Sequence, residues 1–173
     1  FGRDEKIGKS LGVEFYAFDL SDFEQTKKNF QKADVVFHCA ALSSPWGKYE
    51  EFYKANIIAT KNVLKAMELF DIKKIVHVST PSIYFNFQDQ FEIKEEFIPT
   101  KFVNNYAKTK YEAEQLVLNS SVFSAIIRPR AIFGEYDNVL VPRLEKVALK
   151  GFLPLEKKKK TIVDVTYVGN VVY

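Results

Sequence analysis

The sequence predicts an α/β fold in which helices cover both faces of a doubly wound parallel sheet. Short apolar runs alternate with longer amphipathic stretches along the chain, and this alternation is typical of strands joined by helical crossovers. The 173 residues are 47% hydrophobic and include sixteen Phe and nine Tyr, which is enough bulk for a folded core. Their number fits one domain.

The first part of the chain alternates between strands and helices. The runs at 13–18 and 34–39 predict strands, and the second is apolar enough to be buried on both faces of a sheet. Between them, Ser21 is expected to cap a helix over 22–31, with the glutamate three residues later completing a capping box. Residues at helical spacing then predict a long helix over 49–70.

The pattern continues through the second part of the chain. The run at 74–79 predicts a third strand, and residues 80–104 form an irregular loop whose aromatic residues point to function. Beyond it, the pattern predicts a helix at 105–118, a strand at 122–128 and a helix at 139–150. A short strand at 161–165 follows, and one more helix opens at 167–170.

Charge and composition exclude several classes of partner. The formal net charge is +3, and the run 157–160 contributes four lysines, without which 21 basic residues face 22 acidic ones. Such a local patch does not indicate a nucleic-acid partner. We expect no membrane span, because no apolar run approaches about 18 residues. The single Cys39 and the lack of a signal-peptide pattern favour a cytoplasmic protein, and two His make a zinc cluster improbable.

The sharpest chemical motif is the pair Tyr106 and Lys110 on the helix expected at 105–118. Four residues apart, the two side chains share one helical face. A lysine cation beside a tyrosine hydroxyl favours the phenolate, so such a tyrosine can act as general acid or base on a carbonyl or an alcohol. Aromatic–lysine pairs with this spacing are also common on helix surfaces. The spacing therefore indicates a catalytic pair only when the neighbouring sequence supports it.

That context is a hydroxyl cluster, Ser79-Thr80-Pro81-Ser82, at the end of the strand that precedes the long loop. Strand, hydroxyls, loop and Tyr-x-x-x-Lys follow in the order of the short-chain dehydrogenase/reductase superfamily. The chain resembles its extended branch, the NAD(P)-dependent epimerases and dehydratases and the 3β-hydroxysteroid dehydrogenase-like reductases. This resemblance extends over nearly the whole chain and implies a Rossmann-like sheet.

The resemblance also implies roles for individual residues. Tyr106 would donate or accept the proton, and Lys110 would support it and hold the nicotinamide ribose. Thr80 is the aligned hydroxyl, with Ser79 and Ser82 as possible substitutes. Asn56 would order a water relay, although it could equally be a capping or surface residue. The residues implied in cofactor binding are Arg3, Asp19, Leu20, Cys39, Ala40, Ala41, Ser79, Tyr106, Lys110, Pro129 and Ile132.

The cofactor is expected to be NADP or NAD. Arg3 favours NADP, because an arginine fork suits the 2′-phosphate, although a near-terminal arginine can also be plain surface. The Gly-rich phosphate-binding turn is missing, since no three of the seven glycines give its spacing. We therefore expect residues 1–173 to be a partial domain that lacks the first strand, the Gly-rich turn and most of a C-terminal substrate lobe. Alone, these residues should bind NADP weakly or not at all and show no turnover.

The expected function is hydride transfer between the nicotinamide and a carbonyl or secondary alcohol of a steroid-like or 3-oxo/3-hydroxy acyl substrate. The alternatives are a nucleotide-sugar epimerase or dehydratase, and a non-catalytic dinucleotide-sensing protein. The resemblance also implies a possible homodimer through the helices at 49–70 and 105–118. Trp46 and the loop aromatics either contact an apolar substrate or pack the loop onto the sheet; these aromatics are Tyr84, Phe85, Phe87 and Phe91. His38, His77 and Cys39 are expected to be satisfied core residues.

Overall fold

Three parallel strands form the sheet of the first part of the chain. They are β1 (Val36–His38), β2 (Lys74–Val78) and β3 (Phe123–Ile127), and they lie in the order β1-β2-β3. The computed structural model describes residues 1–88, 90–137, 139–151 and 164–173. They form two compact units, 1–128 and 129–173, and the sheet lies in the first. The parallel pairing confirms the predicted α/β class.

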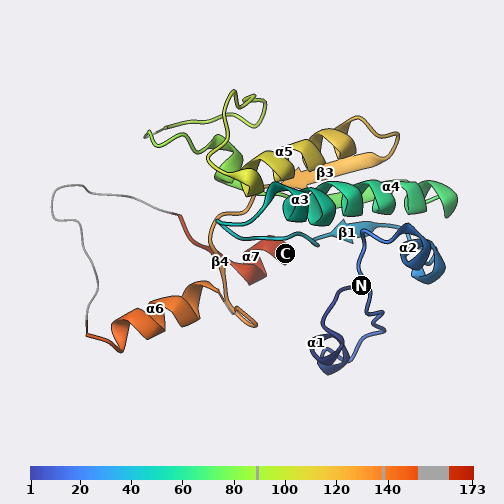
Figure 1. The fold of residues 1–173 in the computed structure, drawn as a ribbon, viewed down its shortest axis with the longest axis horizontal. Helices are drawn as coiled ribbons and strands as arrows, with labels where there is room; N and C mark the ends of the chain where they lie inside the picture. Colours follow the sequence, from blue (N-terminus) through green and yellow to red (C-terminus); the bar gives the residue numbers. More distant parts are fainter. Residues whose placement is uncertain (89, 138, 152–163) are drawn as a thin grey trace. The chain divides into compact units, whose positions relative to one another are not determined.

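Two helices cross between these strands and cover one face of the sheet. α4 (Ala59–Leu69) connects β1 to β2, and α5 (Asn105–Leu118) connects β2 to β3. Figure 1 shows both helices running alongside the strands. Side chains from both helices and from β2 form the buried core with Phe30, and its members are Phe30, Val63, Ala66, Met67, Ile72, Ile75 and Val117.

The predicted helix over 49–70 is continuous, but its middle turns are π-helical. α3 (Tyr49–Phe52) leads into the π-helical segment η1 (Tyr53–Ile58), which continues into α4. A π-helical segment inside an α-helix is rare and is frequent at functional sites. This one carries Asn56, whose contacts are described below.

The remaining elements are short. In the first unit they are α1 (Glu5–Ser10), α2 (Phe23–Asn29) and the 3₁₀ helix η2 (Pro81–Tyr84). In the second unit β4 (Ile132–Phe133) pairs in parallel with β5 (Thr166–Tyr167), and α6 (Leu140–Ala148) and α7 (Val168–Val172) complete the described part. The strand expected at 161–165 falls mostly outside the described residues.

The first residues differ from the prediction. No strand forms over 13–18; a single parallel bridge joins Gly2 and Ala17, with the Gly2 amide donating to Tyr16 and the Phe18 amide to Gly2. A strand forms only where a second backbone segment pairs with it along several residues. Among the described residues, Gly2 alone pairs with this run. α1 was not predicted, although the Asp4 carboxylate caps it by accepting from the Ile7 amide at 3.0 Å.

Two finer expectations for residues 21–39 were wrong. The cap of α2 is Asp22, which accepts from the Gln25 amide, because the Ser21 hydroxyl donates to Asp19 instead. β1 is not buried on both faces: Phe37 points to the face opposite α4 and α5 and is 70% exposed.

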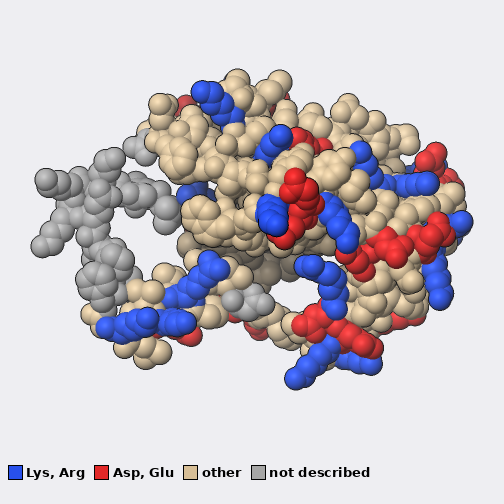
Figure 2. All heavy atoms as spheres, in the orientation of Figure 1, with Lys and Arg blue, Asp and Glu red and all other residues tan. Residues whose placement is uncertain are grey.

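The charged residues show no single-sign field on the face drawn in Figure 2, where Lys and Arg are interspersed with Asp and Glu. The lysine run at 157–160 lies outside the described residues. Among the residues that the structure describes, no helix combines the length and apolar character needed to cross a membrane.

Candidate active site

The Tyr106–Lys110 pair lies in the first turns of α5, beside the end of β2. Asn104 begins the helix, and its side chain accepts from the Ala107 amide at 2.8 Å. Lys110 Nζ donates to the Val78 carbonyl at 2.7 Å, which anchors the lysine to the last residue of the central strand. Tyr106 is half-buried one turn earlier. The helix therefore presents both side chains at the carboxyl edge of the sheet, where ligands bind in parallel α/β folds.

Lys110 is an unusual cation because its surroundings contain almost no water. It is 2% exposed, and burial lowers its pKa from 10.5 to about 8, opposed mainly by the nearby Glu114 carboxylate. At neutral pH the ammonium is still mostly protonated. A charged donor held dry at this position can bind a hydroxyl or stabilise a phenolate strongly, since both effects grow as water is excluded.

Two buried histidines lie beneath Lys110 on neighbouring strands. His38 and His77 are direct partners in the β1–β2 register, with ring centroids 5.2 Å apart. Burial and then Lys110 lower the pKa of His38 to about 4 and lower that of His77 further, so both are neutral. His38 Nε2 bonds the Thr60 hydroxyl at 2.9 Å, as predicted for a satisfied core histidine. His77 is different: neither ring nitrogen has a partner among the described residues.

The hydroxyl cluster follows β2 directly. Thr80 begins η2, and its Oγ1 accepts from the Ser82 amide at 3.2 Å and donates to Ser82 Oγ at 3.0 Å. The Ser79 amide extends the β2–β3 pairing by donating to Ile127. The Ser79 hydroxyl is buried and has no partner among the residues that the structure describes. Such an unpaired donor is costly unless a ligand or water satisfies it.

Asn56 joins three elements through one side chain. Its Oδ1 accepts from the Leu42 amide at 2.7 Å, and its Nδ2 donates to Thr109 Oγ1 at 3.0 Å. Thr109 precedes Lys110 on α5, and both Asn56 and Thr109 are buried. Asn56 is therefore neither a capping nor a surface residue: it ties η1 to α5 and to the segment that follows β1.

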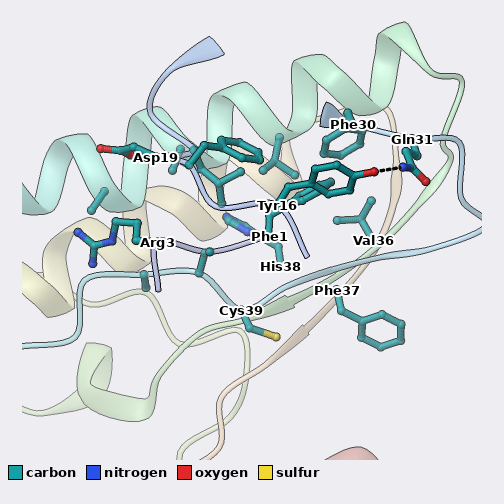
Figure 3. Close-up of a pocket in the computed structure, with 18 of the residues that line it drawn as sticks. Phe1, Arg3, Tyr16, Asp19, Phe30, Gln31, Val36, Phe37, His38 and Cys39 are labelled. Carbon is teal, nitrogen blue, oxygen red and sulfur yellow. Dashed lines mark hydrogen bonds between the residues drawn. The ribbon is translucent and has the colours of Figure 1, made fainter. Parts of the chain in front are cut away.

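A cavity of about 1040 Å³ opens between residues 1–20 and β1. Figure 3 shows Arg3 and Asp19 toward one end and Tyr16 and Gln31 toward the other. Asp19 accepts from the Ser21 amide and hydroxyl and pairs with Lys54 at 3.3 Å. Burial opposes its ionisation, but those hydrogen bonds and Lys54 hold its pKa below the ordinary value.

The candidate cofactor residues fall into three groups. Six of them line this cavity, namely Arg3, Asp19, Leu20, Cys39, Ala40 and Ala41. Cys39 is exposed there and is not the buried residue that was expected, because it follows β1 and lies at the cavity surface. Lys110 and Ser79 lie at the end of β2, with Tyr106 one turn before Lys110. Pro129 and Ile132 belong to the second unit, where Ile132 lies in β4.

Trp46 and most of the loop aromatics do not pack onto the sheet, which was one of the two interpretations of the sequence. Trp46, Phe87 and Phe91 are each more than three-quarters exposed, and Phe85 is also exposed. Tyr84 is the exception, because the Arg128 guanidinium lies over its ring and donates to its hydroxyl. Glu114, the partner of Arg128, was not singled out from the sequence, although it follows Lys110 by four residues on the same helix.

Comparison of the sequence with known proteins identifies a family and several relatives. A sequence profile of the 3-beta hydroxysteroid dehydrogenase/isomerase family matches residues 3–173. The 2-alkyl-3-oxoalkanoate reductase of Shewanella oneidensis is 32% identical over 176 residues, covering 95% of this chain and 46% of that protein. The 3beta-hydroxysteroid-dehydrogenase/decarboxylase isoform 1 of Arabidopsis thaliana is 34% identical over 178 residues, covering 95% and 39%.

Solved structures agree on the fold. The UDP-glucose 4-epimerase of Thermus thermophilus, in complex with NAD, superimposes with a TM-score of 0.76 at 24% identity, covering 92% of this chain and 58% of that one. At this identity the likeness concerns the fold alone. The chain spans about half the length of the curated relatives it matches.

Proposed function

Because the chain belongs to the 3-beta hydroxysteroid dehydrogenase/isomerase family, we propose that it carries the proton-transfer site of an NAD(P)-dependent oxidoreductase of the extended short-chain dehydrogenase type. The observation that carries the proposal is the burial of Lys110 at the end of β2, one helical turn from Tyr106. We take residues 1–173 as part of the dinucleotide-binding domain of that enzyme, with most of the substrate lobe outside them.

The residues present fit a dinucleotide in part. Asp19 and Arg3 at the cavity would receive the adenosine half, and the unpaired Ser79 hydroxyl and Lys110 would face the nicotinamide ribose. The 173 residues contain no Gly-rich turn for the pyrophosphate. When bound, the cofactor supplies a hydride that is exchanged with a carbonyl or carbinol carbon.

The chain's own side chains handle the proton. In reduction, the Tyr106 hydroxyl donates its proton to the substrate oxygen, and Lys110 stabilises the phenolate that remains. Thr80, or Ser79 or Ser82 beside it, donates a hydrogen bond to the same substrate oxygen. Asn56 fixes the helix that carries the pair and would order a water relay behind it. In oxidation, the same proton moves in the opposite direction.

We propose a 3-oxo acyl or steroid-like substrate, because the relatives' names point to both. The exposed aromatics Phe85, Phe87 and Phe91, which follow the hydroxyl cluster, would provide apolar contacts for such a molecule. For the cofactor, Arg3 supports NADP. Competition of NADPH and NADH in the Arg3→Ala variant tests this preference, which should be lost if Arg3 binds the 2′-phosphate.

A homodimer through the helices at 49–70 and 105–118 remains a proposal. α3 and α5 lie side by side, since Tyr49 donates to Glu112 at 3.4 Å and Lys108 lies over the Tyr49 ring. Their outer sides thus form one surface. Sedimentation velocity tests the homodimer. If the protein sediments as a monomer at tens of micromolar concentration, the proposal is wrong.

Replacing Tyr106 by Phe in the full-length protein tests the proposed function. The ring remains and the transferable proton is lost, so kcat for NADPH-dependent ketone reduction should fall by about 10²–10⁴-fold. Tyr111→Phe is the matched control, because Tyr111 lies on the same helix with its ring against Phe102 and should leave the rate unchanged. Undiminished reduction in Tyr106→Phe would show that the acid is assigned wrongly.

A further inference from the structure

A buried carboxylate lies on the same face of α5 as the proton-transfer pair. Tyr106, Lys110 and Glu114 follow one another at intervals of four residues, which places them in one row along the helix. The Glu114 side chain is fully buried. A carboxylate without water is stable only when other groups satisfy it.

Arg128 satisfies it with a two-pronged contact. Arg128 Nε donates to Glu114 Oε1 at 3.0 Å, and Nη2 donates to Oε2 at 2.6 Å. This fork-to-fork geometry fixes orientation as well as position, and it is the geometry that favours arginine over lysine. Arg128 follows the last residue of β3, so the contact locks α5 to the sheet.

The same guanidinium also reaches the segment that carries the hydroxyl cluster. Arg128 Nη1 donates to the Tyr84 hydroxyl and to the Glu95 carbonyl, the latter at 3.0 Å. Tyr84 is the last residue of η2, which begins at Thr80. One arginine thus connects the catalytic helix, the end of β3 and the loop after β2.

Glu114 also acts on Lys110 through charge. The titratable and charged groups around Lys110 are Tyr106 and Glu114 on α5, His38 and Cys39 at the end of β1, and His77 on β2, with Arg128 behind Glu114. Both histidines are neutral, and although Cys39 is exposed as a residue, partial desolvation of its thiol raises the pKa, so it too is uncharged at neutral pH. Glu114 is the carboxylate among them, so it contributes most of the negative potential at the lysine.

We propose that Glu114 is a positioning residue that keeps Lys110 in its charged form beside Tyr106, and that Arg128 holds Glu114, α5 and the Thr80–Tyr84 segment in one fixed arrangement. This inference rests on the proposed function, since it assigns the pair a role in that site. It gives a reason for the buried ion pair beyond stability, which such pairs often do not increase.

The test measures the charge on Lys110 directly in Glu114→Gln. In full-length protein labelled with ¹⁵N-lysine, the Lys110 Nζ resonance, assigned by its loss in Lys110→Met, is followed as a function of pH. The neutral amide removes the attraction and leaves Arg128 as an unbalanced cation, so the apparent pKa of Lys110 should fall by one unit or more from about 8. Glu112→Gln, on the same helix but only partly buried, should leave it unchanged.

Catalysis supplies the second measurement. The alkaline limb of the kcat profile should move to lower pH in Glu114→Gln, in step with the Lys110 titration and with little change in KM. A purely structural role would lower the melting temperature and leave both titrations where they are. An unchanged Lys110 pKa in folded Glu114→Gln overturns the inference.

Two further outcomes are separable. If Glu114→Gln does not fold, Glu114→Asp keeps the charge but draws it back from Lys110, so a smaller fall in the pKa is expected, and no fall overturns the inference. If the wild-type protein reduces no ketone but the Lys110 resonance shifts as described, the proposed function fails while the electrostatic coupling of Glu114 to Lys110 stands.

Discussion

Asn56 shows how much depends on a single side chain in this site. Its amide oxygen accepts from the Leu42 backbone and its amide nitrogen donates to the Thr109 hydroxyl, and the residue is 1% exposed. It stands in the π-helical segment η1, and such segments are frequent at functional sites. The residue thereby links the segment after β1 to the helix that bears Tyr106.

Asn56→Ala should lower the free energy of unfolding by about 2–4 kcal/mol, since it leaves a buried amide and a buried hydroxyl without their partners. Urea denaturation at pH 7 measures the change. Asn62→Ala is the control, because the half-buried Asn62 donates to Leu20 alone, and it should cost about 1 kcal/mol. If both variants lost the same free energy of unfolding, the hydrogen bonds of Asn56 would contribute no more than the single bond of Asn62.

At the scale of elements, α5 was the best predicted part of the chain. The expected helix over 105–118 coincides with the observed one, because a local signal, the Asn104 cap, defines its start. The strand at 13–18 failed because strand formation depends on a partner, which no local pattern encodes. Similarly, Tyr106 and Lys110 could be found from their spacing, whereas the pairing of Glu114 with Arg128 depends on packing between α5 and β3.

The Asn104 cap itself can be tested. Asn104→Ala should destabilise the protein by about 1 kcal/mol, because the Ala107 amide at the start of α5 loses its acceptor. Asn104→Asp keeps an acceptor oxygen and should be close to neutral. Thermal and urea unfolding report both variants. If Asn104→Ala and Asn104→Asp were equally stable, the side chain would contribute nothing as a cap.

Two buried histidines in the paired strands β1 and β2 should make the stability of the fold depend on pH. His38 and His77 have pKa values lowered from 6.5, to about 4 for His38, so the unfolded chain binds more protons than the folded chain as the pH falls below 6.5. Their contribution to stability is complete above pH 6.5; that of His38 is lost toward pH 4, and that of His77 continues to fall at lower pH. Each histidine should reduce the free energy of unfolding by up to about 1.4 kcal/mol per pH unit in this range.

His77→Leu separates this effect from the carboxylates that also titrate in acid. The substitution removes two ring nitrogens that have no partner among the described residues, so stability at pH 7 should be unchanged or higher. Between pH 6 and 5 the slope of stability against pH should be about 1.4 kcal/mol per unit shallower than in the wild type. Identical slopes would mean that His77 does not stay neutral in the fold.

For the whole molecule, the distribution of buried side chains predicts unequal local stability. The hydrophobic core consists of residues from 30 to 117, all in the first unit. In the second unit, α6 and α7 bury no residue that the structure describes. A helix without buried contacts opens at a free energy far below that of global unfolding.

Hydrogen exchange of the 173-residue chain should therefore separate α4 from α6, two helices of similar length. Amides of α4, which buries Val63, Ala66 and Met67 in the core, should exchange only through large-scale unfolding. Amides of α6 should exchange orders of magnitude faster, since propensity alone stabilises a short helix little. Met67→Ala, which creates a core cavity, should accelerate exchange in α4, α5 and β2 together and leave α6 unchanged. Protection in α6 equal to that in α4, or a loss of protection in α6 upon Met67→Ala, would mean that the second unit unfolds together with the first.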